Sequence, residues 1–485
     1  MTLEELVSRL GGVVAAGDLS EAVGGIIHDS RRVRPGWIFA AFPGATAHGL
    51  TYLEEARKRG AAAVLTDRAA PEGETLPWLV SAAPRRDAAV AAWALAGDPQ
   101  RDLTMVGVTG TNGKSTVVHL LWEILQADGR VTGLFGTLAY RVPGVEMVAG
   151  RTTPEAADLA PLLARLVASG GEAAVMEVSS HAIALERVAG LEFDVAVLTN
   201  LSQDHLDFHH DMESYFATKR WLFTDGLAPN GHRVLPLDEP AGERLLAEER
   251  QGDVTYGLAG GEIHAVDPRF GLDGSGFRLS VAGKLGEVHL PLIGEHNLRN
   301  ALAAAAAAHA LGVPTGPILQ ALCAARPLPG RLERVATELP FPVYVDYAHT
   351  PDGLAAMLRS LRRITKRRLL VVFGAGGDRD PGKRIPMGRA VGGLADVAIV
   401  TSDNPRSEEP EAIAAAVASG VRAAGAEPRV VLDRREAIAM ALGMADDRSL
   451  VVIAGKGHEA EQVIGGRRLP FCDREVVSEL AGRLA

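Results

Sequence analysis

The stretch Gly107–Thr116, GVTGTNGKST, constrains the fold more than any other part of the chain. It follows an apolar run, Leu103–Val106, that predicts a strand, and it precedes Val117–Leu125, whose apolar residues have helical spacing. A glycine-rich turn between a strand and a helix points backbone N–H groups at an anion. The stretch therefore predicts a phosphate-binding loop for a nucleoside triphosphate, which we expect to be ATP.

Two residues at the end of this loop carry its chemistry. Lys114 would add a point charge to the phosphates, and the Ser115 hydroxyl would reach a magnesium ion. The spacing departs from GxxxxGK[ST], because Val108 stands where that pattern has its first glycine. A chance glycine-rich turn is the alternative, but strand, Gly-Lys-Ser and helix coincide here. We assign ATP binding in this loop to Gly110, Thr111, Asn112, Gly113, Lys114, Ser115 and Thr116.

Bulk properties limit the class of protein. A length of 485 residues suggests about three domains. The net charge of −10 argues against a nucleic-acid or membrane-surface partner, so we expect small-molecule substrates. Two cysteines make neither a disulfide framework nor a metal cluster and fit a reducing compartment. The N-terminus is unlike a signal peptide, and no stretch has the length and apolarity of a membrane span. We expect a cytoplasmic monomer.

The order of predicted strands and helices divides the chain into three α/β units. Residues 1–98 form the first, 99–330 the second, and 331–485 the third, with the proline-rich Arg326–Arg331 as a linker. In the second unit, strands alternate with helices, which predicts a parallel sheet. The alanine-rich run Ala301–Ala310 predicts a tightly packed core helix. The third unit carries five predicted strands at Val343–Asp346, Leu369–Phe373, Val397–Thr401, Val430–Leu432 and Leu450–Ala454.

Polar side chains follow two strands of the second unit. Glu177 ends the strand Ala173–Val178, where a second magnesium ligand belongs. The next strand leads into Thr199–His209, which crowds two histidines and two aspartates into one loop. No cysteine or further histidine completes a zinc site, so magnesium is the better interpretation. Lys219, ten residues on, has by itself the pattern of a solvated helix lysine.

Three strands of the third unit lead directly into polar loops, Gly374–Asp380, Ser402–Ser407 and Gly455–Glu459. Loops at the carboxyl ends of parallel strands share one crevice, which is the usual ligand position. GAGGDRD lacks the GxGxxG spacing of a dinucleotide site. The crevice gathers Arg379, Asp403, Asn404, Arg406 and Glu459. Both signs of charge suit a zwitterion such as an amino acid, although ordinary turn residues are the alternative.

Taken together, these motifs resemble the Mur ligases of peptidoglycan synthesis. The resemblance rests on GVTGTNGKST, MEVSSH, NLSQDHLDFH, GEHNLRNALAA, GRLERV, DYAHTPD, GDRD, DNPR and GKGHE, in that family's order over nearly the whole chain. It implies a central P-loop-type ATPase with an α/β N-terminal UDP-binding domain and a Rossmann-like C-terminal domain. DSRRV near the start and DNPR narrow it to the members that add diaminopimelate.

The resemblance also implies roles for individual residues. It makes Lys219 a carbamylated lysine, whose anionic carbamate can bind magnesium where a bare ammonium would be repelled. Lys114, Lys219, Glu177 and His205 are then catalytic, and Ser115, Glu177, His205 and Lys219 are metal ligands. Further ATP contacts are Asn297, Asn300, Arg331 and Asp346. The UDP-muramoyl dipeptide would contact Ser30, Thr152, Thr153, Ser179 and Arg187. The amino acid would contact Arg379, Asp403, Asn404, Pro405, Arg406, Gly455 and Glu459.

Two positions depart from the family pattern. Arg151 stands where we expect asparagine, and Leu185 stands where some relatives carry glutamine. Each departure puts one hydrogen bond to substrate in doubt.

The implied activity is an ATP- and magnesium-dependent amide ligase. It would add meso-2,6-diaminopimelate to the D-Glu γ-carboxylate of UDP-N-acetylmuramoyl-L-Ala-D-Glu through an acyl phosphate, for cell-wall biogenesis, cell shape and division. The Arg406 guanidinium is planar and has the geometry to bind the distal carboxylate of diaminopimelate, which lysine lacks. Glu459 would bind the distal ammonium. A lysine-adding relative, a folylpolyglutamate synthetase and a nucleotide switch are the alternatives. No residue distinguishes meso- from LL-diaminopimelate.

Overall fold

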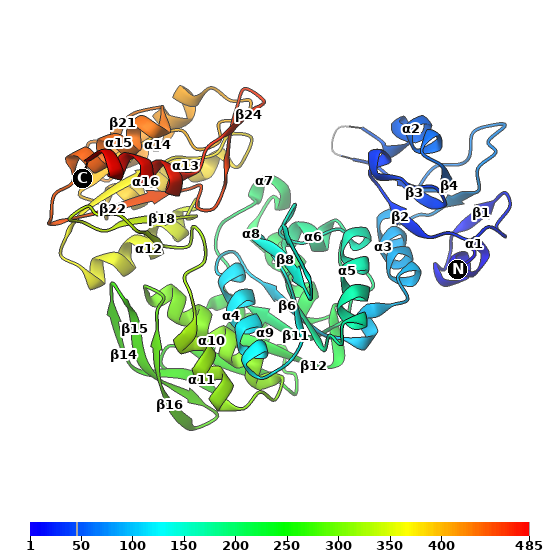
Figure 1. Cartoon of the computed structure of the whole chain (residues 1–485), viewed down its shortest axis with the longest axis horizontal. Coiled ribbons are helices and arrows are strands. Elements are labelled where there is room, and N and C mark those ends of the chain that lie inside the picture. The colour runs from blue at the N-terminus through cyan, green and yellow to red at the C-terminus, as the bar shows by residue number, and fades with distance from the viewer. Residues whose placement is uncertain (45–46, 485) are drawn as a thin grey trace.

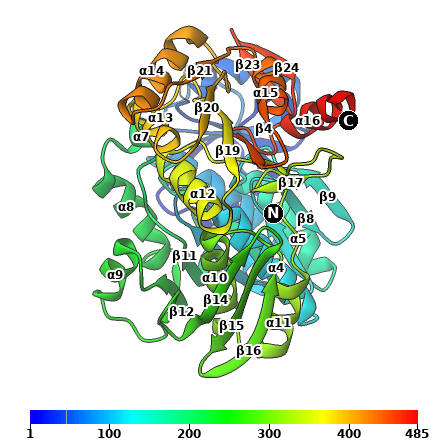
Figure 2. The same cartoon turned by 90° about the vertical axis from the view of Figure 1, so that its left-hand side faces the viewer.

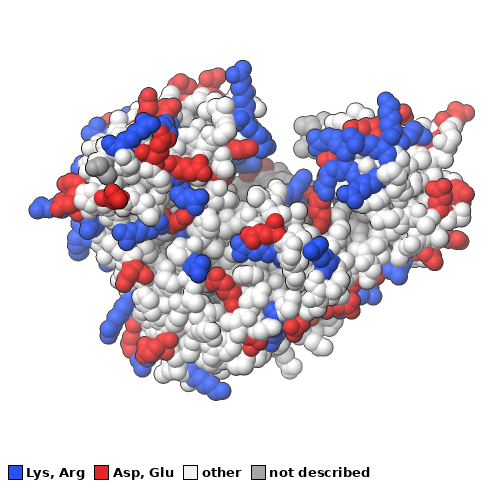
Figure 3. All heavy atoms as spheres, viewed as in Figure 1, with Lys and Arg blue, Asp and Glu red and all other residues white. Residues whose placement is uncertain are grey.

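The computed structural model describes residues 1–44 and 47–484. The chain forms three α/β units in sequence, and Figure 1 shows the first and third at opposite ends of the second. The surface is hollowed between the first and third units (Figure 3). Among the described helices, none is long and apolar enough to cross a membrane.

The N-terminal unit is a five-stranded sheet in the order β1-β5-β4-β3-β2. Its strands are β1 (Val14–Ala16), β2 (Gly25–Ile27), β3 (Trp37–Ala41), β4 (Ala61–Thr66) and β5 (Trp78–Val80), and its helices are α1 (Leu3–Arg9), α2 (Leu53–Lys58) and α3 (Pro84–Leu95). Only β1 is antiparallel. The helix α3 packs against the second unit, where Trp93 Nε1 donates to the carbonyl of Ala189 at 2.8 Å.

The central unit is an eleven-stranded sheet in the order β16-β15-β14-β13-β12-β11-β6-β10-β7-β8-β9. Its strands are β6 (Thr104–Thr109), β7 (Thr132–Phe135), β8 (Ala139–Val142), β9 (Val145–Val148), β10 (Ala173–Glu177), β11 (Phe193–Leu198), β12 (Leu227–Pro236), β13 (Val254–Gly257), β14 (Ile263–Gly271), β15 (Gly274–Val281) and β16 (Lys284–Leu290). From β7 to β14 neighbouring strands are parallel, as predicted.

Both edges of this sheet differ from the prediction, because β8, β9, β15 and β16 pair antiparallel. The reason is the length of the connections: a two-residue turn can join only antiparallel strands. Ala282 and Gly283, between β15 and β16, have φ values of 46° and 82°, which is the conformation of a tight hairpin turn. The predicted parallel sheet is therefore confirmed from β7 to β14, and antiparallel strands extend it at both edges.

Helices cover both faces of the central sheet. They are α4 (Lys114–Ala127), α5 (Ala156–Ala168), α6 (Ser180–Ala184), α7 (Leu206–His209), α8 (Met212–Arg220), α9 (Pro240–Leu246), α10 (Glu295–Ala310) and α11 (Thr315–Ala324). The alanines of α10 up to Ala308 are buried and pack against α4, because small side chains let the two helices approach closely. This confirms the predicted core helix.

The C-terminal unit is a six-stranded sheet in the order β17-β18-β22-β19-β20-β21. Its strands are β17 (Glu333–Val335), β18 (Val343–Asp346), β19 (Arg368–Phe373), β20 (Val397–Val400), β21 (Arg429–Val430) and β22 (Ser449–Ala454), with a separate hairpin of β23 (Glu461–Ile464) and β24 (Arg467–Pro470). Its helices are α12 (Pro351–Ile364), α13 (Arg384–Gly392), α14 (Pro410–Ala423), α15 (Arg434–Met444) and α16 (Asp473–Leu484). The five predicted strands are present, although β21 begins one residue before the predicted strand begins and ends two residues before that strand ends. The strand β17 and the hairpin are additional.

Figure 2 shows the C-terminal unit above the central one, with α12 over α10. His296 Nδ1 and Ser360 Oγ join these helices at 3.3 Å, and Arg363 pairs with Glu295. Asp346, the last residue of β18, lines the same cavity as Asn112 and Gly113 of the phosphate loop, so the carboxyl end of this strand faces that loop.

Candidate active site

The phosphate loop connects β6 to α4 and depends on two glycines with positive φ. Gly110 has a φ of 145° and Gly113 a φ of 87°. A Cβ on Gly110 would lie 1.9 Å from Thr199 Oγ1, and one on Gly113 would lie 2.3 Å from Asn300 Oδ1. Backbone conformation and close approach thus both require glycine at these positions.

Lys114 begins α4 and folds back over the loop. Its Nζ donates to the carbonyls of Gly110 and Thr111, each at 2.9 Å. Burial lowers the pKa of Lys114, and the nearby carboxylates of Glu177 and Asp204 oppose that shift. The amino group therefore lies beside the loop backbone, where it can contact a phosphate.

Lys219 on α8 lies against the same loop and is only 2% exposed. Its Nζ donates to the Gly110 carbonyl at 3.0 Å and to Thr109 Oγ1 at 3.4 Å. Burial and then the charge of Lys114 lower the pKa of Lys219 well below its ordinary value. The interpretation as a solvated helix lysine is wrong, because α8 packs its inner face against the end of β6.

Glu177 is the last residue of β10, and His205 lies in the loop between β11 and α7; both strands are neighbours of β6. Glu177 is buried and accepts hydrogen bonds from Thr137 N at 2.7 Å and Thr137 Oγ1 at 3.1 Å. His205 precedes α7, and its Nε2 lies 3.5 Å from Asp204 Oδ2. Burial lowers the pKa of His205 to about 3, so its ring is neutral near pH 7, which is the form that binds metals.

No group of three or more His, Cys, Asp or Glu in the described residues lies close enough to hold a metal ion. The predicted ligand set differs from such a cluster, since it combines Glu177 and His205 with the Ser115 hydroxyl and a carbamate on Lys219. The buried carboxylate of Glu177 and the neutral ring of His205 are compatible with magnesium and its bound waters. An unmodified ammonium group at Lys219 would repel the magnesium ion.

A cavity of about 560 Å³ lies between the central and C-terminal units, next to the phosphate loop. Its lining includes seven predicted ATP residues, Asn112, Gly113, Thr116, Asn297, Asn300, Arg331 and Asp346. Gly110, Thr111, Lys114 and Ser115 are not among the lining residues and lie within the loop itself. Arg331 spans the cleft, with Nη2 3.4 Å from Ser115 Oγ and the guanidinium 4.6 Å from the Tyr347 ring centre.

Two of these residues are held by their neighbours. Asp346 accepts from the backbone N–H groups of Leu332 at 2.6 Å and Ala348 at 2.8 Å. Asn300 Nδ2 donates to Asn297 Oδ1 at 3.2 Å. The Asn pair therefore presents its remaining polar atoms from α10 in a defined orientation.

A second cavity of about 270 Å³ lies at the carboxyl ends of the C-terminal strands. Six of the seven predicted amino-acid residues line it, Arg379, Asp403, Asn404, Arg406, Gly455 and Glu459, and Pro405 does not. The central unit contributes Asp204, His205 and Asp207. We call this cavity the amino-acid crevice. Its shared wall with His205 places it next to the predicted metal ligands.

The crevice holds both signs of charge. Arg406, at a φ of 56°, donates from Nη1 to the Gly377 carbonyl at 2.6 Å. Glu459 Oε2 accepts from Asn404 Nδ2 at 2.7 Å and Lys456 Nζ at 2.9 Å, and no hydrogen bond engages Oε1 within the described chain. Asp403 Oδ2 is buried and has no hydrogen-bond partner among the described residues. These free acceptors suit an ammonium group.

Gly455 makes room for Asp403. A Cβ at Gly455 would lie 2.4 Å from Asp403 Oδ2, and the φ of Gly455 is 117°. Burial raises the pKa of Asp403, and Arg434 and Lys456 oppose that shift. An unpaired buried carboxyl is costly, which is typical of a ligand site.

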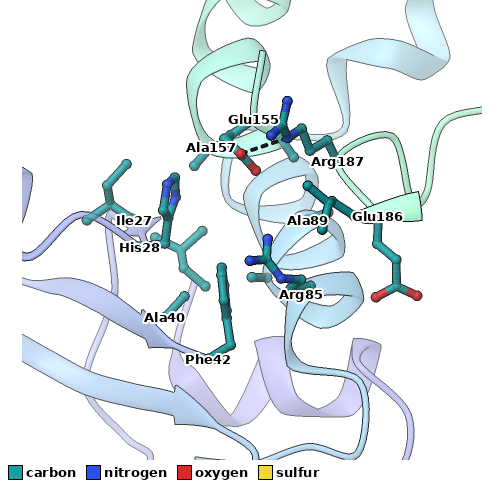
Figure 4. Close-up of a pocket in the computed structure, with 14 residues that line it drawn as sticks. Ile27, His28, Ala40, Phe42, Arg85, Ala89, Glu155, Ala157, Glu186 and Arg187 are labelled. Atoms are coloured by element: carbon teal, nitrogen blue, oxygen red, sulfur yellow. Dashed lines mark ion pairs between the residues drawn. The ribbon is translucent and has the colours of Figure 1, made fainter. Parts of the chain in front are cut away.

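Figure 4 shows a small pocket between the N-terminal and central units. His28 stacks on Phe42 with ring centres 5.9 Å apart, and the Arg85 guanidinium lies 4.3 Å from the Phe42 ring centre. On the other side Arg187 Nε pairs with Glu155 Oε1 at 2.8 Å. Sequence reasoning found Arg187 but missed His28, Phe42 and Arg85, because they belong to separate segments with no shared motif.

The remaining predicted substrate residues fall into two groups. Thr153 Oγ1 accepts from Ser179 N at 3.0 Å and donates to the Glu177 carbonyl at 2.9 Å, and Arg187 Nη1 lies 3.4 Å from the Thr153 carbonyl. Thr152 joins them, since its Oγ1 accepts from Thr137 Oγ1 at 3.1 Å. Ser30 lies apart, and its hydroxyl donates to Glu55 Oε2 at 2.7 Å.

Arg151 and Leu185, the two residues that depart from the pattern expected from the sequence, both lie near the pocket of Figure 4. Arg151 Nη1 lies 3.0 Å from Glu155 Oε1, the same oxygen that Arg187 contacts. Leu185 lines the pocket of Figure 4. Arg151 therefore adds positive charge where an asparagine would add an amide.

Comparison with known proteins covers all three units. Models of the Mur ligase family catalytic domain, the Mur ligase middle domain and the Mur ligase glutamate ligase domain match residues 22–96, 108–308 and 330–457. The chain is 44% identical to the UDP-N-acetylmuramoyl-L-alanyl-D-glutamate–2,6-diaminopimelate ligase of Streptomyces coelicolor, over 98% of this chain and 96% of that protein. It is 43% identical to the enzyme of that name from Gloeobacter violaceus, over 99% and 98%.

A solved structure of a protein with the same name superposes with a TM-score of 0.68 at 30% identity. The superposition covers 100% of this chain and 99% of that one, so all three units have counterparts there.

Proposed function

The chain belongs to the Mur ligase family, and we propose that it joins meso-2,6-diaminopimelate to the D-Glu γ-carboxylate of UDP-N-acetylmuramoyl-L-Ala-D-Glu at the expense of ATP. It is an ATP-dependent ligase. One observation carries the proposal beyond the family: the amino-acid crevice of the C-terminal unit shares its wall with His205, beside the phosphate loop. An amine bound there would meet a carboxylate activated at the loop.

Each unit would bind one substrate. We assign the UDP end to residues 1–98 together with the pocket of Figure 4, where Arg85 and Arg187 supply positive charge and Phe42 an aromatic face. Residues 99–330 would bind ATP, and 331–485 the amino acid. We propose that the chain acts as a monomer. The reaction would belong to cytoplasmic peptidoglycan precursor synthesis, on which cell shape and division depend.

Lys219 would act as a carbamate. Its lowered pKa increases the fraction of uncharged amine, and an uncharged amine attacks carbon dioxide. A nitrogen–carbon bond forms and one proton leaves, which converts the side chain into an anion. Ser115, Glu177, His205 and this carbamate would hold magnesium, which would neutralise phosphate charge when bound.

The chain's own residues would drive two steps. Lys114 and the loop N–H groups would hold the triphosphate while the γ-carboxylate attacks the γ-phosphorus, producing ADP and an acyl phosphate. The amine held in the crevice would then attack the acyl carbon, phosphate would leave, and the amine's proton would pass to solvent. Arg331, which spans the cleft, would couple closure to nucleotide binding.

Specificity would come from the far end of the crevice. Arg406 would pair with the distal carboxylate, and Asp403 and Glu459 with the distal ammonium. Lysine has the amine but no second carboxylate. A site built for a polar group can reject the analogue lacking it by about 10⁴-fold.

The test is phosphate release from ATP by the purified chain with UDP-N-acetylmuramoyl-L-Ala-D-Glu present. Meso-diaminopimelate, L-lysine or no amino acid is added in turn. We expect release only with diaminopimelate. Release with lysine alone would contradict the specificity, and equal release in all three would leave an ATPase without ligase activity.

A further inference from the structure

Three side chains with permanent positive charge line the amino-acid crevice: Arg379, Lys383 and Arg406. Arg379 is exposed, and its Nη1 donates to the Asp378 carbonyl at 2.9 Å. Lys383, which directly precedes α13, is instead buried, with 6% of its surface exposed. Within the described residues, its amino group makes no hydrogen bond and no ion pair within 4.0 Å. Lys383 therefore offers an ammonium without a protein partner to the crevice that it lines, which suits an anionic ligand.

Lys383 lies at the end of the crevice that faces the central unit. Burial raises the pKa of Asp204, but the nearby charges of His205, His349 and Lys383 outweigh burial and lower it. The charged groups close to Arg406 are, by contrast, Arg379, Asp403, Glu459 and Asp378, all from the C-terminal unit. Lys383 and Arg406 therefore line one cavity, and Lys383 is the one whose charge acts on Asp204 in the wall that the central unit contributes.

Two carboxylates near Lys383 are not positioned to neutralise it. Asp204 lies across the cleft, beyond ion-pair distance from Lys383. Asp380 caps the turn before Lys383, since its Oδ1 accepts from Gly382 N at 2.8 Å. The Lys383 ammonium is therefore available to a ligand in the crevice.

Diaminopimelate has an amino-acid group at each end. If Arg406 binds the distal carboxylate, the other carboxylate is attached to the carbon that carries the attacking amine. That second carboxylate then enters the end of the crevice where Lys383 lies. We propose that Lys383 binds the carboxylate adjacent to the attacking amine and so orients that amine toward the acyl phosphate. This inference rests on the proposed function and adds the contact at the reacting end of the same ligand.

The test uses Lys383→Met, which removes the charge and keeps the length, in phosphate-release assays with saturating ATP and UDP-muramoyl dipeptide. We expect the KM for diaminopimelate to rise by about tenfold to a hundredfold, the usual effect of losing a charged hydrogen bond. The KM for ATP and for the dipeptide should stay unchanged. Lys383→Arg should restore much of the affinity, and Lys366→Met, at an exposed lysine of the same unit, is the matched control.

Two analogues, each measured as a competitive inhibitor of diaminopimelate-dependent phosphate release, separate carboxylate binding from other roles. L-Lysine keeps the carboxylate beside its α-amine and lacks the distal one, so Lys383→Met should raise its inhibition constant by about the same factor as the KM for diaminopimelate. 1,5-Diaminopentane has no carboxylate, so its inhibition constant should stay unchanged. An equal rise for both analogues would overturn the inference in favour of a structural role, and an unchanged KM for diaminopimelate would also overturn it. Wild-type chain that shows no diaminopimelate-dependent release would instead refute the proposed function itself.

Discussion

Arg434 and Asp473 form an ion pair with no exposed side-chain surface, directly beneath the amino-acid crevice. Two hydrogen bonds of 2.7 Å join the guanidinium to the carboxylate. Arg434 Nη2 also donates to the Ala454 carbonyl at 3.0 Å, at the end of β22. The pair thus ties α15 and α16 to the strand that leads into Gly455.

Breaking this pair should destabilise the C-terminal unit strongly. Asp473→Ala leaves the Arg434 charge buried without its partner, which typically costs about 3–5 kcal/mol. Denaturant unfolding would measure the loss. The double variant Arg434→Met/Asp473→Leu removes both charges and should recover most of the stability. A double variant no more stable than the single one would contradict this account.

Lys219 should make stability depend on pH. Its pKa is lowered in the folded chain, so between that lowered pKa and the pKa of the unfolded lysine, near 10.4, the folded state binds fewer protons than the unfolded state. The free energy of unfolding should therefore rise with pH from the lowered folded pKa up to about 10. Lys219→Met removes this contribution.

Measured without bicarbonate, Lys219→Met should unfold at a higher denaturant concentration than wild type at pH 7 and should lose ligase activity. Lys219→Arg should also lose activity, because a guanidinium forms no carbamate. Mass spectrometry of wild type in bicarbonate would detect the added group. Full activity in either variant would rule out the proposed role.

Gly113→Ala should weaken ATP binding. The new Cβ would lie 2.3 Å from Asn300 Oδ1 at a φ of 87°, so the loop and α10 must separate. We expect a rise in the ATP KM of about tenfold or more, since a strained backbone position costs about 1–3 kcal/mol. Gly316→Ala is the control, because nothing lies within 4 Å of that Cβ. Equal ATP KM values for the two variants would contradict the prediction.

Arg406→Met should reduce the preference for diaminopimelate over lysine. The distal carboxylate would lose the guanidinium that binds it. We expect the ratio of kcat/KM for diaminopimelate to kcat/KM for lysine to fall by about a hundredfold or more. Arg389→Met, at an exposed position on α13, is the control. If the ratio stays at its wild-type value, another residue determines specificity.

Local patterns determined much of the fold and some of the site. Glycine spacing and helical periodicity predicted the phosphate loop and α4, and the apolar runs predicted the five main C-terminal strands. The antiparallel edges of the central sheet were not predicted. The sequences of β15 and β16 indicate β structure but do not show with which strand each one pairs. The stack of His28 on Phe42 was missed for a similar reason, since those residues share no motif.

By itself, the sequence determined which residue types are available and in which loops, because strand ends and turns are set by neighbouring residues. Only the tertiary structure decided the pKa of the Lys219 amino group and the position of Lys383. A lysine's pKa depends on how much water surrounds it, and α8 packing against β6 removes that water. Likewise, Lys383 and His205 line one cavity only because two separate sheets present the loops after their strands to one cleft. Burial and proximity across units are properties of packing, which no local pattern specifies.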